Sequence, residues 1–113
     1  ELYDTCAGRE LLANLPQTIS MSRWGDEFYG TLHPKIGHAG DTLRDVFEIG
    51  EVAMWPPGNA FCIFFGPTPA SVGAEPRTAS PCVPLGRIKG DATLFRNFGS
   101  SLKNATLTAG NQV

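Results

Sequence analysis

The 113-residue chain has little charge, no long apolar stretch and no excess of basic side chains. Only 18% of its residues are charged, against about 25% in an average globular protein, so the composition favours a chain that buries a core over a disordered one. A net charge of -2 supplies no positive field for nucleic acid or for an anionic membrane surface. The longest strongly apolar run, residues 60–65, is far shorter than the roughly 20 residues that cross a bilayer. We therefore expect neither nucleic acid nor a membrane as a partner.

Cysteine is scarce and odd in number, and the sequence has no Cys-x-x-Cys motif. A secreted domain held by disulfides carries a denser and even set of cysteines. The chain begins at Glu1, and no charged segment followed by an apolar leader opens it. A reducing, cytoplasmic setting is therefore expected.

Metal-binding side chains are also few. His33, His38 and Asp41 share one glycine-rich loop, but a metal site needs three or four converging ligands held in place by further hydrogen bonds. We expect this loop to be solvated, and the sequence predicts neither a metal nor a cofactor.

Glycine and proline, by contrast, are abundant. The 13 glycines and 9 prolines make up about a fifth of the chain, against about 12% in an average protein. So many helix breakers exclude a helical bundle and a coiled coil. Together with the length, they predict one turn-rich β domain over residues 1–113.

One substantial helix is expected, over residues 6–15. The side-chain oxygen of Asp4 or Thr5 can cap its first turn, and Pro16 ends it. Helical spacing predicts a buried stripe made of Leu11, Leu12 and Leu15.

The rest of the chain predicts short strands. Apolar and polar residues alternate over 18–22, and the turn Trp24-Gly25-Asp26 connects that strand to 27–32 as a hairpin. Residues 60–65 are apolar without interruption, which is typical of a strand buried on both faces. The full set of expected strands is 1–3, 18–22, 27–32, 46–49, 52–55, 60–65, 83–89 and 102–108, with loops over 33–41 and 66–81 and a short helix or turn over 91–98.

Two motifs carry a resemblance to a known family. Residues 24–29, Trp-Gly-Asp-Glu-Phe-Tyr, are close to a Trp-Gly-x-Glu-x-Tyr motif, and residues 55–69 contain a Trp-Pro-Pro-Gly…Phe-Phe-Gly-x-Thr-Pro block. Residues 1–15 and 82–90 resemble a strand with its helix and a strand with its turn in cyclophilins. The chain thus resembles, over nearly its whole length, small single-domain bacterial and archaeal cyclophilin-like proteins of unknown function.

The resemblance implies a mainly β fold: a small closed β-barrel with one main capping helix and one short helix. Cyclophilin-like chains carry a first strand and a turn before the point that corresponds to Glu1. The first strand is therefore expected to be absent from this chain, which leaves a gap beside the last strand. Upstream residues or a neighbouring subunit would fill the gap, and the second case predicts a homo-oligomer.

The resemblance also implies a pocket. Alternation along 60–65 puts Ala60, Cys62 and Phe64 on one face, and that face lines the peptide pocket in cyclophilins. Cyclophilins have glutamine, phenylalanine and histidine at the positions of Ala60, Cys62 and Cys82, and a small residue at the position of Trp55. Their Phe-His-Arg motif, whose arginine polarises the prolyl amide, has no counterpart. We therefore expect no catalytic residues and a protein that is not an isomerase.

The prediction for function is a non-catalytic domain that binds a small apolar ligand or a peptide at this altered pocket. Three alternatives remain open: a prolyl isomerase with a degenerate site, an enzyme that uses a reactive thiol of Cys62 or Cys82, and a structural or assembly module whose aromatic residues only close the barrel. The candidate pocket residues are Trp55, Ala60, Cys62, Phe64, Cys82, Trp24 and Tyr29.

Overall fold

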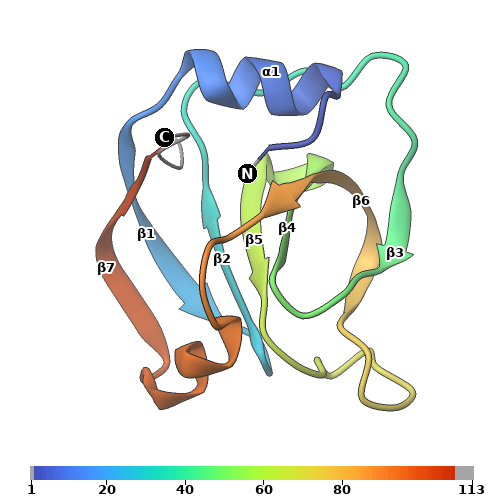
Figure 1. The fold of residues 1–113 in the computed structure, drawn as a ribbon, viewed down its shortest axis with the longest axis vertical. Helices are drawn as coiled ribbons and strands as arrows, with labels where there is room; N and C mark the ends of the chain where they lie inside the picture. Colours follow the sequence, from blue (N-terminus) through green and yellow to red (C-terminus); the bar gives the residue numbers. More distant parts are fainter. Residues whose placement is uncertain (1, 109–113) are drawn as a thin grey trace.

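A seven-stranded antiparallel sheet forms the body of the computed structural model, which describes residues 2–108 (Figure 1). The sheet curls around the core, and the helix α1 (Cys6–Ala13) lies across one end of it. Two short 3-10 helices, η1 (Pro56–Gly58) and η2 (Ala92–Asn97), connect strands. The strands are β1 (Gln17–Arg23), β2 (Glu27–Thr31), β3 (Arg44–Val46), β4 (Glu51–Trp55), β5 (Ala60–Phe64), β6 (Arg77–Arg87) and β7 (Ser101–Leu107).

The sheet is open, so the closed barrel expected from the sequence is wrong. Its strand order is β3-β6-β4-β5-β2-β1-β7, which leaves β3 and β7 at its two ends. In Figure 1 these two strands lie on opposite sides of the view. Within residues 2–108, β7 pairs with β1 alone. A barrel closes only when its edge strands bond to each other, and the strands described here do not complete that circle.

The sequence correctly predicts the start of α1. Thr5 is the N-cap, and its Oγ1 accepts a hydrogen bond of 3.0 Å from the Gly8 amide. The carboxylate of Asp41 accepts from the amides of Cys6 and Ala7 at 3.0 and 2.9 Å. These bonds satisfy amides that the first helical turn leaves without partners, and they tie the loop that contains Asp41 to the helix.

The end and the buried face of α1 differ from the prediction. The helix ends at Ala13, two residues early, because Asn14 caps it with its amide bonded to Leu11 and Leu12 carbonyls. Leu11 is buried, whereas Leu12 is 51% exposed. Only one side of so short a helix can contact the sheet, so Leu12 does not belong to the buried stripe.

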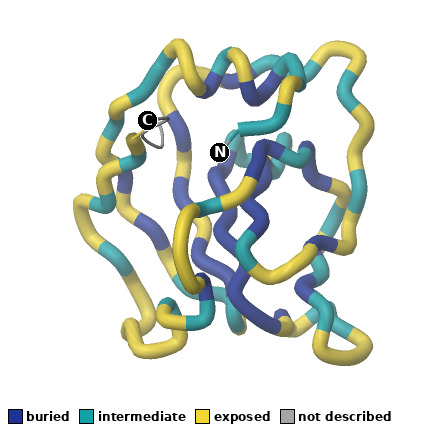
Figure 2. The backbone as a smooth tube through the Cα atoms, in the orientation of Figure 1, coloured by how far each residue is buried: buried dark blue, intermediate teal, exposed yellow. Residues whose placement is uncertain are grey.

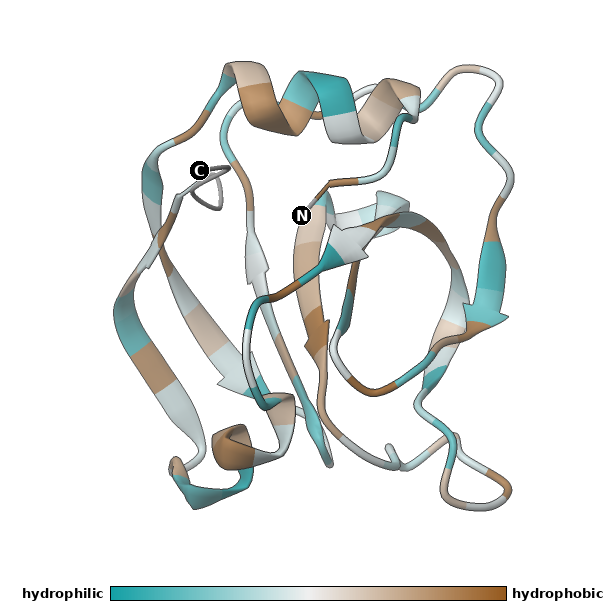
Figure 3. Ribbon diagram, viewed as in Figure 1, coloured by the Kyte–Doolittle hydropathy of each residue, from teal (hydrophilic) through white to brown (hydrophobic). Residues whose placement is uncertain are grey.

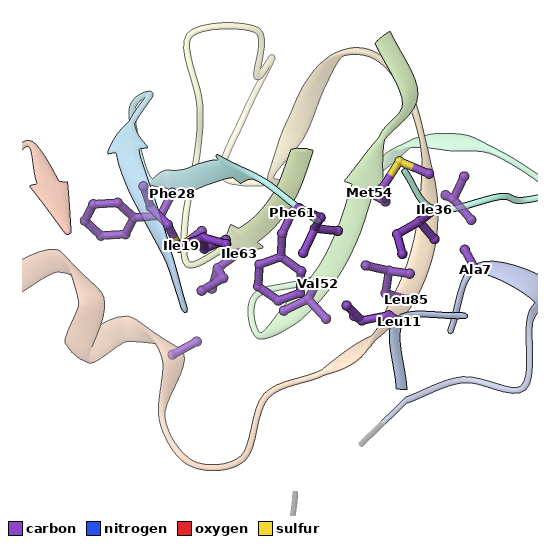
Figure 4. Packing of buried hydrophobic residues seen from close by; sticks show 14 of the residues in the cluster. Ala7, Leu11, Ile19, Phe28, Ile36, Val52, Met54, Phe61, Ile63 and Leu85 are labelled. Carbon is purple, nitrogen blue, oxygen red and sulfur yellow. The ribbon is translucent and has the colours of Figure 1, made fainter. Parts of the chain in front are cut away.

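Alternation along the central strands separates two buried clusters. The main core contains Phe28 of β2 and Phe61 and Ile63 of β5, and Figure 4 shows them packed with residues of β4, β6 and α1. The opposite face of β5 carries Cys62 and Phe64, which belong to a smaller cluster. All five residues of β5 are buried, as the uninterrupted apolar run predicts.

The burial pattern and the hydropathy follow the strand order. Figure 2 shows buried residues concentrated in the middle of the sheet, in β4 and β5. No residue of β7 is buried. Figure 3 shows that β5 is apolar along its length whereas β3 carries hydrophilic residues. Burial of apolar side chains, which favours folding, therefore occurs mainly in the central strands.

The largest error in the predicted elements concerns β6, which runs from Arg77 to Arg87. The composition of residues 66–81 predicts a loop there, so residues 77–81 are an unexpected part of the strand, and Pro81 and Pro84 within it cannot donate ladder hydrogen bonds. The structure accommodates them where the ladder is irregular: pairing with β3 and with β4 shifts register near both prolines. The first half of β6 pairs with β3, which consequently lies at 44–46 and not at the expected 46–49.

Candidate functional site

A cavity of about 210 Å³ opens on the face of the sheet opposite the main core. Strands β2, β4, β5 and β6 contribute to its wall, and the β1–β2 turn contributes Trp24. The lining residues are Trp24, Glu27, Tyr29, Trp55, Ala60, Cys62, Thr78, Ala79 and Cys82.

The structure brings six of the seven candidate pocket residues together around this cavity. The exception is Phe64, which does not line it and instead stacks on Phe47 with 4.7 Å between ring centroids. Phe64 therefore belongs to the smaller buried cluster, beside the cavity. The six that line the cavity are Trp24, Tyr29, Trp55, Ala60, Cys62 and Cys82.

Sequence reasoning missed Glu27, Thr78 and Ala79. Glu27 could have been found, because it is two residues before Tyr29 on the same strand and therefore points to the same face. Thr78 and Ala79 lie in the part of β6 whose composition predicts a loop, so strand periodicity does not single them out.

Three aromatic side chains line the cavity, and a hydrogen bond holds the side chain of one of them, Trp55. Trp55 Nε1 donates to Ser80 Oγ at 2.7 Å. The backbone amide of Trp24 donates to the Glu27 carbonyl at 2.8 Å, which closes the turn that carries Trp24. Tyr29 is 39% exposed. The aromatic wall is therefore rigid at Trp55 and open to solvent at Tyr29.

Glu27 is the unusual group of the cavity. Its side chain is buried, with 6% exposed, and Oε1 has no hydrogen-bond partner among the described residues. Burial raises the pKa of Glu27 from 4.5 to about 7, and a hydrogen bond from Cys62 opposes part of this shift. Burial disfavours the charged form of a carboxyl group, so Glu27 changes charge near neutral pH.

A second buried carboxylate, Glu51 of β4, shows the usual arrangement. It pairs with Arg44 at 2.6 Å and accepts from the Tyr3 hydroxyl and the Glu48 amide, both at 2.8 Å. Burial alone would raise the pKa of Glu51, but hydrogen bonds from Arg44, Glu48 and Tyr3 bring it below its ordinary value. Buried charges in proteins are normally paired in this way, and Glu27 is not.

The two cavity thiols are buried and free. The pKa of Cys62 is raised well above its ordinary value by hydrogen bonding with Cys82, by burial and by the nearby Glu27 carboxylate. A reactive thiol needs the opposite shift, toward the thiolate. The geometry therefore does not favour nucleophilic chemistry at Cys62.

The described lining of the cavity contains no arginine. Arg23, at the end of β1, lies with its guanidinium 5.0 Å from the centroid of the Phe65 ring and pairs with Asp26 at 2.9 Å. Phe65 belongs to the main core, so Arg23 is directed to the other side of the sheet. The cavity thus offers a carboxylate and aromatic faces, and no guanidinium from these residues.

Over residues 2–108, no group of three or more His, Cys, Asp or Glu side chains could hold a metal ion. No helix in the same range is long and apolar enough to cross a membrane.

A curled antiparallel sheet with one helix across its end and a cavity on its second face defines a small mainly β protein of the cyclophilin type. The sequence model of the cyclophilin-like family matches residues 1–105, and the chain belongs to this family. This confirms the resemblance found in the sequence motifs. A similar solved structure is the solution structure of a hypothetical protein from Archaeoglobus fulgidus, which is 32% identical with a TM-score of 0.75. The match covers 96% of this chain and 84% of that one. No curated protein matches the sequence.

Proposed function

We propose that this cyclophilin-like chain is a non-catalytic binding protein that takes a small ligand into the cavity between β2, β5 and β6. The observation that carries the proposal is a mainly apolar cavity of about 210 Å³ walled by three aromatic side chains. Ligand sites are typically apolar hollows with a few polar groups that orient the ligand. This cavity is smaller than the roughly 300–1,000 Å³ of common ligand sites, which favours a small molecule or one side chain of a peptide.

Binding is favoured over prolyl isomerisation by the chemistry of the wall. An isomerase of this fold needs a cation that polarises the prolyl amide. The described wall carries one charged group, Glu27, and it is an acid. In the twisted transition state the amide nitrogen regains its lone pair, and a carboxylate has no proton to donate to it, so the cavity lacks that element of the reaction among the residues described.

The proposal is tested by blocking the entrance of the cavity with a larger side chain. Ala79 lines the cavity yet is exposed, so Ala79→Phe fills the entrance without disturbing the core. The matched control is Ala74→Phe, an exposed site that does not line the cavity. Both tryptophans of the chain line the cavity, so their fluorescence reports binding. We expect 1-butanol to change the fluorescence of the wild type and the control, and not of Ala79→Phe.

A response that survives unchanged in Ala79→Phe would contradict the proposal, because the alcohol would then bind elsewhere. No saturable response in any of the three proteins would contradict it as well. Circular dichroism of each variant confirms that the comparison is between folded proteins.

The open edge of the sheet favours a second function, assembly. Beside β7 lies a cleft of about 370 Å³ whose wall includes Val52 and Phe61 of the main core and Leu107 of β7. An unpaired strand edge next to apolar surface invites pairing with another chain. We propose that a strand from a second copy pairs with β7. Light scattering is then expected to give twice the mass of one chain, and a monomeric mass would overturn this proposal.

A further inference from the structure

We propose that the ligand of the cavity is a small organic cation, an alkylammonium ion that donates an N–H to Glu27 Oε1 while its carbon atoms contact Trp24, Tyr29 and Trp55. This inference rests on the proposed binding function and names the chemical class of the ligand. Three independent features support it: an unpaired acid, an aromatic wall and the absence of a competing cation among the described lining residues.

The unpaired acid is the first feature. Glu27 Oε1 is buried in the wall of the cavity, and no described group donates to it. A buried polar atom without a partner costs free energy and needs a structural or functional reason. In the same protein, buried Glu51 accepts hydrogen bonds from three other residues. The fold can therefore satisfy a buried carboxylate, yet it leaves one oxygen of Glu27, a residue that lines the cavity, without a described donor.

The aromatic wall is the second feature. A cation within about 6 Å of an aromatic centroid is attracted to the ring face, most strongly for tryptophan. The cavity has two tryptophans and one tyrosine in its lining, and the hydrogen bond to Ser80 fixes the indole of Trp55. Aromatic walls combined with an acid are the arrangement that recognises ammonium groups, since the rings contact the carbon atoms and the carboxylate accepts the N–H.

The charges around Glu27 are the third feature. Its titratable neighbours in the lining are Tyr29 of β2, Cys62 of β5 and Cys82 of β6. None of these carries a positive charge in any protonation state. At the β1–β2 turn, the cation Arg23 pairs with Asp26 on the side of the main core. An anionic ligand would be repelled by Glu27, whereas a cation supplies the charge that the described lining lacks.

This arrangement predicts how affinity depends on pH. Burial raises the pKa of Glu27 to about 7, so an ammonium ion that needs the carboxylate must displace a proton at lower pH. The ionised fraction of a group with this pKa rises about tenfold from pH 6 to pH 8. Affinity for an ammonium ion is therefore expected to rise about tenfold over that interval. Affinity for a neutral molecule of the same shape has no such increase.

The experiment compares n-butylammonium with 1-butanol, which match in size and differ in charge. Tryptophan fluorescence is titrated at pH 6 and pH 8 at constant ionic strength, because salt screens charge. At pH 8 we expect n-butylammonium to bind at least tenfold more tightly than the alcohol. Glu27→Gln keeps the shape of the side chain and removes its charge. The variant is therefore expected to lose the preference for n-butylammonium and still to bind the alcohol. Glu48→Gln, which neutralises an exposed acid outside the cavity, is the matched control.

The outcomes separate this inference from the proposed function. If the alcohol binds but n-butylammonium binds no more tightly, the inference of a cationic ligand is wrong. The same holds if Glu27→Gln still prefers n-butylammonium. In both cases the proposed binding function of the cavity stands. If neither probe binds, both fail. Carbon NMR of the Glu27 carboxyl adds a readout that does not need a variant: saturating n-butylammonium is expected to lower its pKa, and 1-butanol is not. An unchanged pKa at saturation would overturn the inference.

Discussion

At the scale of single residues, two buried glutamates are expected to make the stability of the protein depend on pH in opposite directions. Glu51 is ionised and paired with Arg44, whereas Glu27 is unpaired and its pKa is raised to about 7. A group whose pKa is raised by folding binds more protons in the folded protein than in the unfolded chain. Its contribution is therefore complete below the unfolded pKa and is lost as pH rises through the folded value.

Glu27 is accordingly expected to make the protein less stable as the pH rises from weakly acidic to neutral. Between its ordinary pKa of 4.5 and the folded value of about 7, the free energy of unfolding is expected to fall by about 3 kcal/mol through this group. Glu27→Gln removes the effect, so the variant gains stability relative to the wild type between pH 5 and pH 8. Urea unfolding at both pH values measures the difference. Equal pH dependence in the two proteins would show that Glu27 is not buried as described.

The three cysteines are expected to differ in reactivity. Cys62 and Cys82 are buried, and the pKa of Cys62 is raised, whereas Cys6 is only partly buried. Thiol reagents react with accessible thiolates. A disulfide reagent of the Ellman type should therefore label Cys6 first, and the other two only after unfolding. Rapid labelling of Cys62 in the folded protein would instead support the alternative of an activated thiol.

At the scale of elements, Gly8 shows that a close contact with the N-terminal segment outweighs helix propensity in α1. A Cβ at this position would lie 2.5 Å from the carbonyl oxygen of Tyr3. Since real Cβ atoms do not approach that closely, α1 or the strand segment before it must move to accept any side chain. Glycine at this position lets α1 pack close to β6, whose Leu85 carbonyl is 3.6 Å from the same point.

Gly8→Ala is therefore expected to destabilise the protein, although alanine favours a helix by about 1 kcal/mol. We expect a net loss of about 1–2 kcal/mol, because strain in a packed contact exceeds that gain. Gly99→Ala is the matched control, since nothing lies within 4 Å of a Cβ there. Thermal or urea unfolding compares the three proteins. A Gly8→Ala variant as stable as the control would mean that α1 has room to shift.

At the scale of the whole molecule, Glu51 connects segments that are distant in the sequence. Its carboxylate accepts from Tyr3 near the start of the chain and from Arg44 of β3. The guanidinium of Arg44 in turn lies 4.5 Å from the centroid of the Phe47 ring. One buried carboxylate thus ties the N-terminal segment, β3 and β4 together.

Glu51→Gln is expected to destabilise the folded protein by about 2–3 kcal/mol at pH 7, because Arg44 loses its ion pair and two donors lose an acceptor. Folding lowers the pKa of Glu51, so its contribution is present above the unfolded pKa and is lost as pH falls through the folded value. The difference between wild type and variant in urea unfolding should therefore shrink in acid. A difference that stays constant down to pH 2 would contradict the ion-pair explanation.

Elements governed by local chemistry were predictable from the sequence. Thr5 was one of two expected caps, the turn after Arg23 produced the hairpin, and period-two alternation separated the faces of β5. The family resemblance also led to six residues of the cavity. Phe64 has the same parity as Cys62 and was therefore included, but the ring of Phe47 covers it, and no local pattern predicts that stacking.

The sequence by itself determined which residues alternate, where the helix begins and which side chains of β5 share a face, because these depend on spacing and on neighbouring residues. Only the tertiary structure decided that β6 begins at Arg77 and that Glu27 Oε1 is buried with no hydrogen-bond partner among the described residues. Each of these depends on what distant strands bring to the position. A strand that contains prolines forms where its ladder is irregular enough to accept them, and Glu27 Oε1 has no partner because no described group is placed to donate to it.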